Sequence, residues 1–383
     1  MPDALVALLA QLVSFPTIAG ESNVELVTFL AERLEGLGAR VTVLPATRPD
    51  ARNLHAVLGP ADTPDGLLLA AHCDVVAVEG QPWTRDPFEL HEADGRLYGR
   101  GTADMKGPLA CILAALAELD AGALARPVHL AVSSDEELGC AGVPPLLDAL
   151  AALTAPVGRA LVAEPTSLRV ATAHKGKAAV RIVLRGRAAH SSVAPTGVNA
   201  VAYAGRLIGE LLVLQDEIAR GARDDAFAVP YASIGIGPIS GGVSVNIVPD
   251  SCRLDVEVRS LPGDDPGAIV ARIAAIAGSL AREMQASAAE AGIELVPLSA
   301  YPGLAPTDPV FAARIAALAG DDDAPRSLDF GTEAGLYQQR LGVPVVVCGP
   351  GSMEQAHKAD EYISAEQLRA GRQFFAQLLA DAP

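Results

Sequence analysis

Four apolar segments of this chain are each followed by acidic or imidazole side chains, and this repetition constrains the fold more than any other feature. The segments are residues 66–72, 127–134, 159–163 and 343–348. The first is apolar at successive positions, which is typical of a strand in a sheet that is covered on both faces. In open α/β sheets, ligands bind at the carboxyl ends of the strands. The sequence therefore predicts an α/β domain in which these four strand ends meet at one edge.

The side chains at these strand ends are histidines and carboxylates. His72 and Asp74 close the first segment, and residues two apart on a strand share a face. Cys73 lies between them and points the other way, so we interpret it as a core residue. The other three segments are followed by further candidate ligands, namely Glu136, Glu137, Glu164 and His357.

The glycine-rich segment 99–107 adds one more acid, Asp104. The apolar run that follows it, 108–116, predicts a buried helix. Asp104 has three interpretations: a cap for this helix, a solvated turn residue or a metal ligand. A dinucleotide-binding turn is excluded, because Asp104 stands where that motif needs its third glycine.

Length, charge and cysteine content bound the class of protein. A chain of 383 residues exceeds one ordinary core and favours two domains. Every apolar run is interrupted before about 18 residues, so we expect no membrane-spanning helix. Five cysteines without CxxC spacing suit a reducing cytoplasm. The net charge of −17 disfavours nucleic acid and acidic membranes as partners. The acidic run at residues 321–323 is interpreted as a solvated turn.

A second domain is predicted between the third and fourth apolar segments. Three stretches alternate as half-buried strands do and two have helical periodicity: 178–186, 231–236, 251–259, 199–221 and 266–291. This order describes a small α+β sheet with one open face. We therefore expect an inserted domain at residues 173–290 and a main domain formed by residues 1–172 and 291–383.

The candidate ligands have the chemistry of a two-metal site. Imidazoles and carboxylates together are expected for zinc, manganese or cobalt. A single catalytic zinc takes three protein ligands and water, so five ligands indicate two ions joined by a bridging carboxylate. Each ion would then have one imidazole and one further carboxylate. The proposed ligands are His72, Asp104, Glu137, Glu164 and His357.

Two acids remain outside this ligand set and receive other roles. Neighbouring acids diverge in a turn, so Glu136 can act as the general base while Glu137 binds metal. Glu136 would take a proton from water and return it to a leaving amine. Asp74 would hold the far nitrogen of His72 and fix its tautomer.

Taken together, these residues resemble the dinuclear zinc amidohydrolases and exopeptidases, which include acetylornithine deacetylase, succinyl-diaminopimelate desuccinylase and the glutamate carboxypeptidases. The resemblance covers essentially the whole chain and rests on residues 72–76, 99–107, 134–137, 163–166 and His357. It implies a mixed-sheet catalytic domain covered by helices, and an inserted domain that dimerises and serves as a lid. It also implies two Zn²⁺ per chain, with Co²⁺ or Mn²⁺ as possible substitutes, Asp104 as the bridging ligand, and a cis peptide bond between Asp104 and Met105.

Within this family the chain is most similar to the acetylornithine deacetylases, in residues 83–88, 102–107, 331–334, 349–352, 355–357 and 360–362. The resemblance implies hydrolysis of N2-acetyl-L-ornithine to acetate and L-ornithine, a step of arginine biosynthesis. The desuccinylases have a serine-aspartate pair where this chain has Thr332 and Glu333, so we expect these two to bind substrate. Glu333 would receive the side-chain ammonium of ornithine. A desuccinylase, or another N-acyl-amino-acid deacylase, is the alternative.

The inserted domain carries three more residues to which the resemblance gives a role. His190 matches a histidine that reaches the active site of the partner subunit and stabilises the oxyanion. Asn246 and Arg259 match groups that hold the substrate carboxylate. On their own, His190 would be an exposed loop residue and Arg259 a surface charge. A metal-binding relative without activity is the alternative of another class, but such a protein should lack the base, and Glu136 is present.

Overall fold

The chain folds into two compact units, and a computed structural model describes residues 3–381 of it. Unit 1 contains the residues up to Ala173, Leu304–Ser327 and the residues from Thr332 onward. Unit 2 contains His174–Gly303 and Leu328–Gly331, so it is inserted into unit 1. Among the described residues, no helix is both long and apolar enough to cross a membrane.

Unit 1 is built on a sheet of eight strands in the order β1-β2-β6-β3-β7-β14-β8-β13. The strands are β1 (Arg40–Pro45), β2 (Arg52–Leu58), β3 (Gly66–His72), β6 (Val128–Ser133), β7 (Val157–Val162), β8 (Ala171–His174), β13 (Arg326–Leu328) and β14 (Val345–Val347). The four apolar segments of the sequence form β3, β6, β7 and β14, which are consecutive parallel neighbours. Both β1 and β2 pair antiparallel, so the predicted α/β fold with a mixed sheet is confirmed.

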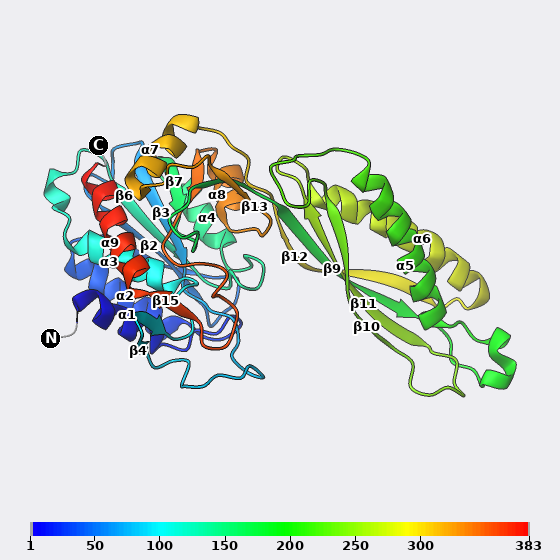
Figure 1. The fold of residues 1–383 in the computed structure, drawn as a ribbon. Helices are drawn as coiled ribbons and strands as arrows, with labels where there is room; N and C mark the ends of the chain where they lie inside the picture. Colours follow the sequence, from blue (N-terminus) through cyan, green and yellow to red (C-terminus); the bar gives the residue numbers. More distant parts are fainter. Residues whose placement is uncertain (1–2, 382–383) are drawn as a thin grey trace. The chain divides into compact units, whose positions relative to one another are not determined.

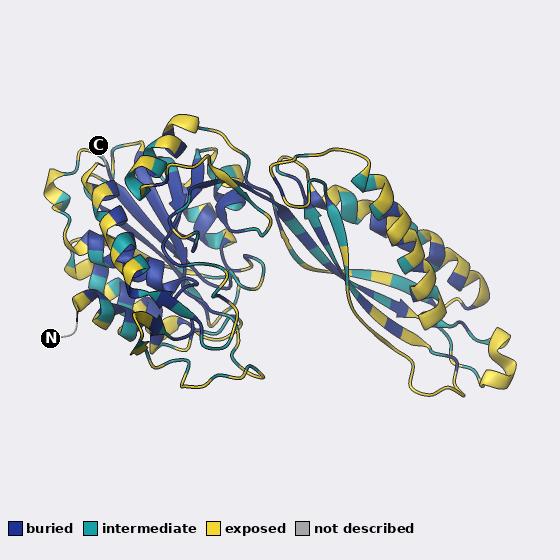
Figure 2. Ribbon diagram, viewed as in Figure 1, coloured by how far each residue is buried: buried dark blue, intermediate teal, exposed yellow. Residues whose placement is uncertain are grey.

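Helices cover both faces of this sheet because each has an apolar side that must be buried. One face packs against α1 (Ala4–Val13), α2 (Val24–Gly36), α3 (Lys106–Ala117), α7 (Pro309–Ala319) and α9 (Ala365–Ala380). The other face carries α4 (Pro144–Ala151) and α8 (Ala334–Leu341). Figure 1 shows α3 beside α9, and Figure 2 shows the strands between the helices as almost uniformly buried.

The turn before α3 lies close against its surroundings. Gly101 has a positive φ of +84°, which few other residues adopt without strain. A Cβ on Gly107 would lie 2.2 Å from the carbonyl oxygen of Thr102, so only glycine fits there. The peptide bond between Asp104 and Met105 is cis, as the resemblance implies.

A small three-stranded sheet, in the order β15-β5-β4, joins this turn to the end of the chain. Its strands are β4 (His91–Ala93), β5 (Arg96–Tyr98) and β15 (Tyr362–Ser364). The backbone N–H of Gly99 donates to the carbonyl of Glu361, at 2.9 Å, just beyond the paired strands. Segments about 260 residues apart in sequence therefore meet beneath Asp104.

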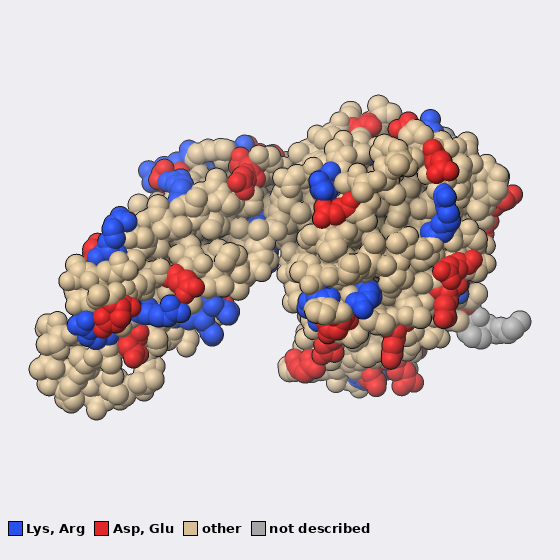
Figure 3. Space-filling model, turned by 180° about the vertical axis from the view of Figure 1, so that it is seen from behind, with Lys and Arg blue, Asp and Glu red and all other residues tan. Residues whose placement is uncertain are grey.

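Unit 2 is a four-stranded antiparallel sheet, in the order β10-β11-β9-β12, that packs against two helices. These elements are β9 (Gly176–Arg185), α5 (Ala200–Ala219), β10 (Ser233–Gly241), β11 (Ser251–Ser260), α6 (Pro266–Ser287) and β12 (Gly292–Tyr301). Burial alternates strictly along β9 and β11, as one covered face requires. On the face shown in Figure 3, acidic and basic side chains of unit 2 lie close together, in keeping with ion pairs such as Arg206–Glu283.

The chain returns to unit 1 later than the predicted boundary at residue 291. Residues 292–301 form β12, which pairs with β9 in the sheet of unit 2, and the return comes at Leu304. Pro297 and a register shift interrupt the alternation of β12, which conceals it in the sequence. The acidic run also differs from prediction, because Asp321 is buried and accepts from the backbone N–H of Val170 at 2.8 Å.

Candidate metal centre and active site

Strand ends and two loops bring the candidate ligands together at one edge of the eight-stranded sheet. His72 is the last residue of β3, and Glu137 and Glu164 follow β6 and β7 closely. Asp104 lies in the turn before α3, and His357 lies in the loop between β14 and β15. Because β3, β6, β7 and β14 run parallel, their carboxyl ends share this edge.

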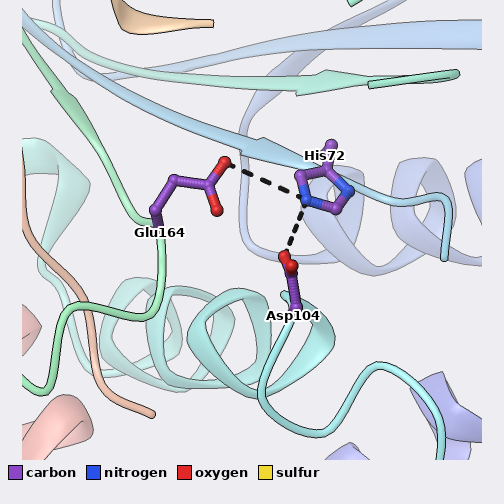
Figure 4. A group of neighbouring side chains, drawn as sticks. All are labelled: His72, Asp104 and Glu164. Carbon is purple, nitrogen blue, oxygen red and sulfur yellow. Dashed lines mark hydrogen bonds and ion pairs between the residues drawn. The ribbon is translucent and has the colours of Figure 1, made fainter. Parts of the chain in front are cut away.

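The first group of ligands consists of His72, Asp104 and Glu164, all of them buried (Figure 4). Nε2 of His72 lies 3.0 Å from Oδ1 of Asp104 and 4.0 Å from Oε1 of Glu164. The three ligand atoms all lie within 4.8 Å of one another, so a single ion could contact all of them.

The second group consists of Asp104, Glu137 and His357. Nε2 of His357 lies 3.2 Å from Oδ2 of Asp104 and 3.1 Å from Oε2 of Glu137. Asp104 therefore presents one carboxylate oxygen to each group. The His357 side chain is 46% exposed, which leaves this side of the centre open to solvent.

The acids of this centre have shifted pKa values. Burial, together with repulsion from Asp104, raises the pKa of Glu164 to about 8. Burial also raises the pKa of Glu136 well above its ordinary value. Burial opposes the ionisation of Asp104 as well, but hydrogen bonds from two imidazoles outweigh it and hold its pKa below the usual range. The cluster thus gathers more carboxylate charge than its imidazoles balance.

The donor set fits two divalent metal ions. Each group offers one imidazole, one carboxylate of its own and one oxygen of Asp104, which with water makes the usual catalytic coordination of zinc. Divalent ions would also supply the positive charge that favours the ionised form of these acids. Asp104 does not cap α3, whose N-terminus has no side-chain cap, so of its three interpretations the geometry favours the metal ligand.

Asp74 makes shorter contacts with the backbone of the turn after β6 than its carboxylate makes with the imidazole of His72. Nδ1 of His72 lies 3.0 Å from the Asp74 carbonyl oxygen and 3.6 Å from its carboxylate. The carboxylate instead accepts from the backbone N–H groups of Glu136, at 3.1 Å, and Glu137, at 3.0 Å. Asp74 thereby fixes the turn in which Glu137 belongs to the second ligand group and Glu136 stays outside it.

The two predicted substrate residues of unit 1 lie in the interior. The hydroxyl of Thr332 accepts from the backbone N–H of Ala334 at the start of α8. Glu333 is 1% exposed, and among the described residues its Oε1 has no hydrogen-bond partner. Burial raises its pKa to about 7, although a hydrogen bond from Ser133 opposes this. Tyr337, one turn further along α8, also has a buried oxygen with no partner in residues 3–381.

The structure brings together two of the three predicted residues of unit 2. His190 and Asn246 lie on adjoining loops, since the N–H of Ser191 donates to the Asn246 carbonyl and His190 forms a bridge with Ile247. Arg259 lies near the other end of β11, where Nε donates to Glu257 at 2.7 Å. Because Arg259 and Ser251 lie eight residues apart on β11, its two ends are roughly 26 Å apart, at about 3.3 Å per residue. The roles of these three residues stay predictions.

Sequence reasoning gave no role to Arg100 and Glu361, which form a buried ion pair directly behind Asp104. Both lie inside segments that carry the family resemblance, beside Gly99 and before β15. Their place in these segments was the available signal, but their pairing depends on a contact between parts of the chain that are 261 residues apart.

Residues 68–381 match the model of peptidase family M20/M25/M40, and the chain belongs to this family. It is therefore a hydrolase, and its fold and its two ligand groups are those expected of a metal-dependent one. The chain is 34% identical over 388 residues to acetylornithine deacetylase of Proteus mirabilis strain HI4320, covering 98% of this chain and 95% of that protein. The family membership expected from the sequence is confirmed.

Solved structures share the fold over almost the full length. The M20 family metallo-carboxypeptidase Sso-CP2 of Sulfolobus solfataricus superposes with a TM-score of 0.77 at 20% identity, covering 98% of each chain. The YxeP protein of Bacillus subtilis, described as a dinuclear metal-binding peptidase, gives 0.69 at 18% identity and covers 98% of this chain and 96% of its own.

Proposed function

We propose that this protein hydrolyses the amide bond of N-acyl amino acids, with N2-acetyl-L-ornithine as its substrate and acetate and L-ornithine as products. Two Zn²⁺ ions, replaceable by Co²⁺ or Mn²⁺, would be held by the two ligand groups. The observation that carries the proposal is the pair of groups that share Asp104, together with Glu136, which belongs to neither group but interacts electrostatically with His72, Glu164 and Glu137. The similarity to an acetylornithine deacetylase supports the choice of acyl group and amino acid.

The chain's own residues account for the proton transfers of such a reaction. When bound, the metal ions would polarise the amide carbonyl and lower the pKa of water. Glu136 takes a proton from water as its oxygen attacks the carbonyl carbon, and a raised pKa suits a general base. It then gives this proton to the amide nitrogen, the C–N bond breaks, and acetate and the free amine leave. Asp74 keeps Glu136 in place through its backbone N–H.

A buried carboxylate supports a cationic side chain on the substrate. Glu333 lies in unit 1, where it adds to the repulsion that raises the pKa of Glu136 and Glu164. A buried acid with an oxygen that has no partner is costly unless a cation or donor meets it. The ammonium of ornithine is such a cation, whereas an apolar acyl amino acid offers none.

Two features of unit 2 support a homodimer formed through this unit. His190 and Asn246 lie on loops beyond the Ser251 end of β11, and Arg259 lies roughly 26 Å from Ser251 along the strand, so one substrate can meet all three only if two chains contribute. In addition, β10 is an edge strand, and α5 beside it exposes Leu212 and Val213, at 55% and 63%. An unpaired edge with exposed apolar residues is a surface suited to a second copy.

The environment we propose is the cytoplasm. All five cysteines lie among the described residues, and each is a buried free thiol. This state is ordinary where thiols are kept reduced.

A panel of N-acyl amino acids tests the proposed reaction. We expect kcat/KM to be highest for N-acetylornithine, lower for N-acetylmethionine and lower again for N-succinyl-diaminopimelate. A preference for the succinylated substrate would instead identify a desuccinylase. Protein that holds two metal ions but turns over no member of the panel would be the inactive relative.

A further inference from the structure

The buried ion pair of Arg100 and Glu361 lies behind the candidate metal centre and takes no part in the reaction described above. Arg100 is 0% and Glu361 1% exposed, and Nη1 of Arg100 donates to Oε2 of Glu361 at 2.7 Å. A buried ion pair is weak evidence for a stabilising role, because the cost of desolvating both ions offsets their attraction. The other contacts of the two residues indicate a different purpose.

Glu361 holds the backbone of the shared ligand. Its Oε1 accepts from the backbone N–H of Ala103, at 2.8 Å, and from that of Asp104, at 3.0 Å. These bonds fix the main chain from which the Asp104 carboxylate extends. Since that carboxylate reaches one ligand group with each oxygen, a shift of this backbone would change both sets of distances.

Arg100 holds the backbone next to the second imidazole. Its Nη1 also donates to the carbonyl of Lys358, at 3.3 Å, and its Nη2 donates to Oε1 of Gln81. Gln81 in turn donates from Nε2 to the carbonyl of His357, at 3.5 Å. The guanidinium therefore contacts, directly or through one amide, the main chain of His357 and of the residue after it.

We infer that Arg100 and Glu361 are positioning residues that set the spacing between Asp104 and His357. They would thereby control the affinity of the metal ion bound by the second group. Within residues 3–381 the hydrogen bonds of the pair reach Asp104 and the His357 loop, and none reaches His72 or Glu164. The inference rests on the proposed two-metal function and names the residues that align its second site.

The test variant is Glu361→Gln. Glutamine has the same size, but one of its two terminal atoms is an NH₂ donor. It cannot accept both from Arg100 and from the two backbone N–H groups, so one set of bonds is lost. We expect the dissociation constant of the ion at the second group, which the pair holds from both the Asp104 side and the His357 side, to rise about 10- to 100-fold, as for other changes behind a metal ligand, and that of the other ion to rise less.

The measurements are made on the loaded protein without substrate. Metal content after titration with a chelator gives the two affinities, and the visible spectrum of the Co²⁺ form reports ligand geometry. Arg100→Lys is a second variant, which keeps the charge but cannot reach Glu361, Lys358 and Gln81 at once. It should loosen the same ion, even if Glu361→Gln fails to fold.

Asp321→Asn is a matched control in unit 1. Asp321 is also a buried carboxylate that pairs with an arginine, Arg169, and accepts from a backbone N–H, that of Val170. If Glu361→Gln acts only by disturbing a buried ion pair, Glu361→Gln and Asp321→Asn should lower the Tm alike and have the same effect on metal binding. We expect Asp321→Asn to keep both metal affinities and the Co²⁺ spectrum of the wild type.

The outcomes separate this inference from the function on which it rests. If wild-type protein binds two ions and both Glu361→Gln and Arg100→Lys bind them with unchanged affinity and spectrum, the pair is only structural and the inference is overturned. An equal rise in the dissociation constants of both ions would also contradict the inference. Wild-type protein that binds fewer than two ions would overturn the proposed function, and the inference with it.

Discussion

Two variants that are each inactive should form an active heterodimer. His190→Ala removes the proposed oxyanion donor, and a donor of this kind is worth about 10²–10³ in kcat. Arg259→Ala removes the proposed anchor for the substrate carboxylate. Arg259 lies near one end of β11, and His190 lies on a loop beyond the other end, at Ser251, which is roughly 26 Å away at about 3.3 Å per residue. One substrate can therefore meet both only if they come from different chains.

The assay uses dimers of defined composition. Two differently tagged chains are co-expressed, and the heterodimer is isolated on both tags in turn. In a dimer of His190→Ala with Arg259→Ala, one of two symmetric sites draws an intact arginine from one chain and an intact histidine from the other. We expect such a dimer to show about half of the wild-type kcat per dimer.

The reciprocal dimer gives the control. Wild-type chain paired with a chain that carries both substitutions should be nearly inactive, because each of its sites lacks one group. The opposite pattern, with activity in this control and none in the mixed dimer, would show that both residues serve the same site from one chain. That result would refute the reasoning, as would a fully active monomer.

Three further predictions concern single residues. Asp104→Ala should lose metal as well as activity, because both groups use this carboxylate; full metal content by elemental analysis would contradict its shared role. Glu333→Gln should lower kcat/KM for N-acetylornithine more than for N-acetylmethionine, and an unchanged ratio would remove Glu333 from substrate recognition. Burial lowers the pKa of both His55 and His129 to about 4, from an ordinary value of 6.5. Both are thus neutral in the folded protein, and the stability present above pH 6.5 should be lost as the pH falls towards 4, by about 3 kcal/mol per histidine. The pH dependence of unfolding should therefore be weaker in His129→Gln than in wild type, and equal slopes would contradict this.

The sequence was sufficient to predict the sheet edge and the residues gathered there. Apolar strands of this kind run parallel in α/β domains, so the groups after β3, β6 and β7 had to meet. Asp104 was harder, because a glycine-rich turn before a helix has several uses. The family resemblance implied its bridging place, and its two carboxylate oxygens lie 3.0 Å from Nε2 of His72 and 3.2 Å from Nε2 of His357.

The features that sequence reasoning missed depend on contacts between distant segments. The carboxylate of Asp74 lies 3.6 Å from Nδ1 of His72, the nitrogen expected from the sequence, but it also accepts from the turn after β6, which no spacing within one strand reveals. Glu361 reaches Ala103 across 258 positions. β12 was missed because a register shift near Pro297 breaks its period.

The central claim is that two metal ions bind around Asp104 while Glu136 supplies the base. The most direct measurement determines metal content and kcat together for wild type and for Glu136→Gln. We predict about two ions per chain in both proteins and a loss of about 10²–10⁴ in kcat for the variant. A variant that keeps the wild-type kcat, or one that loses activity only because it loses metal, would contradict the claim.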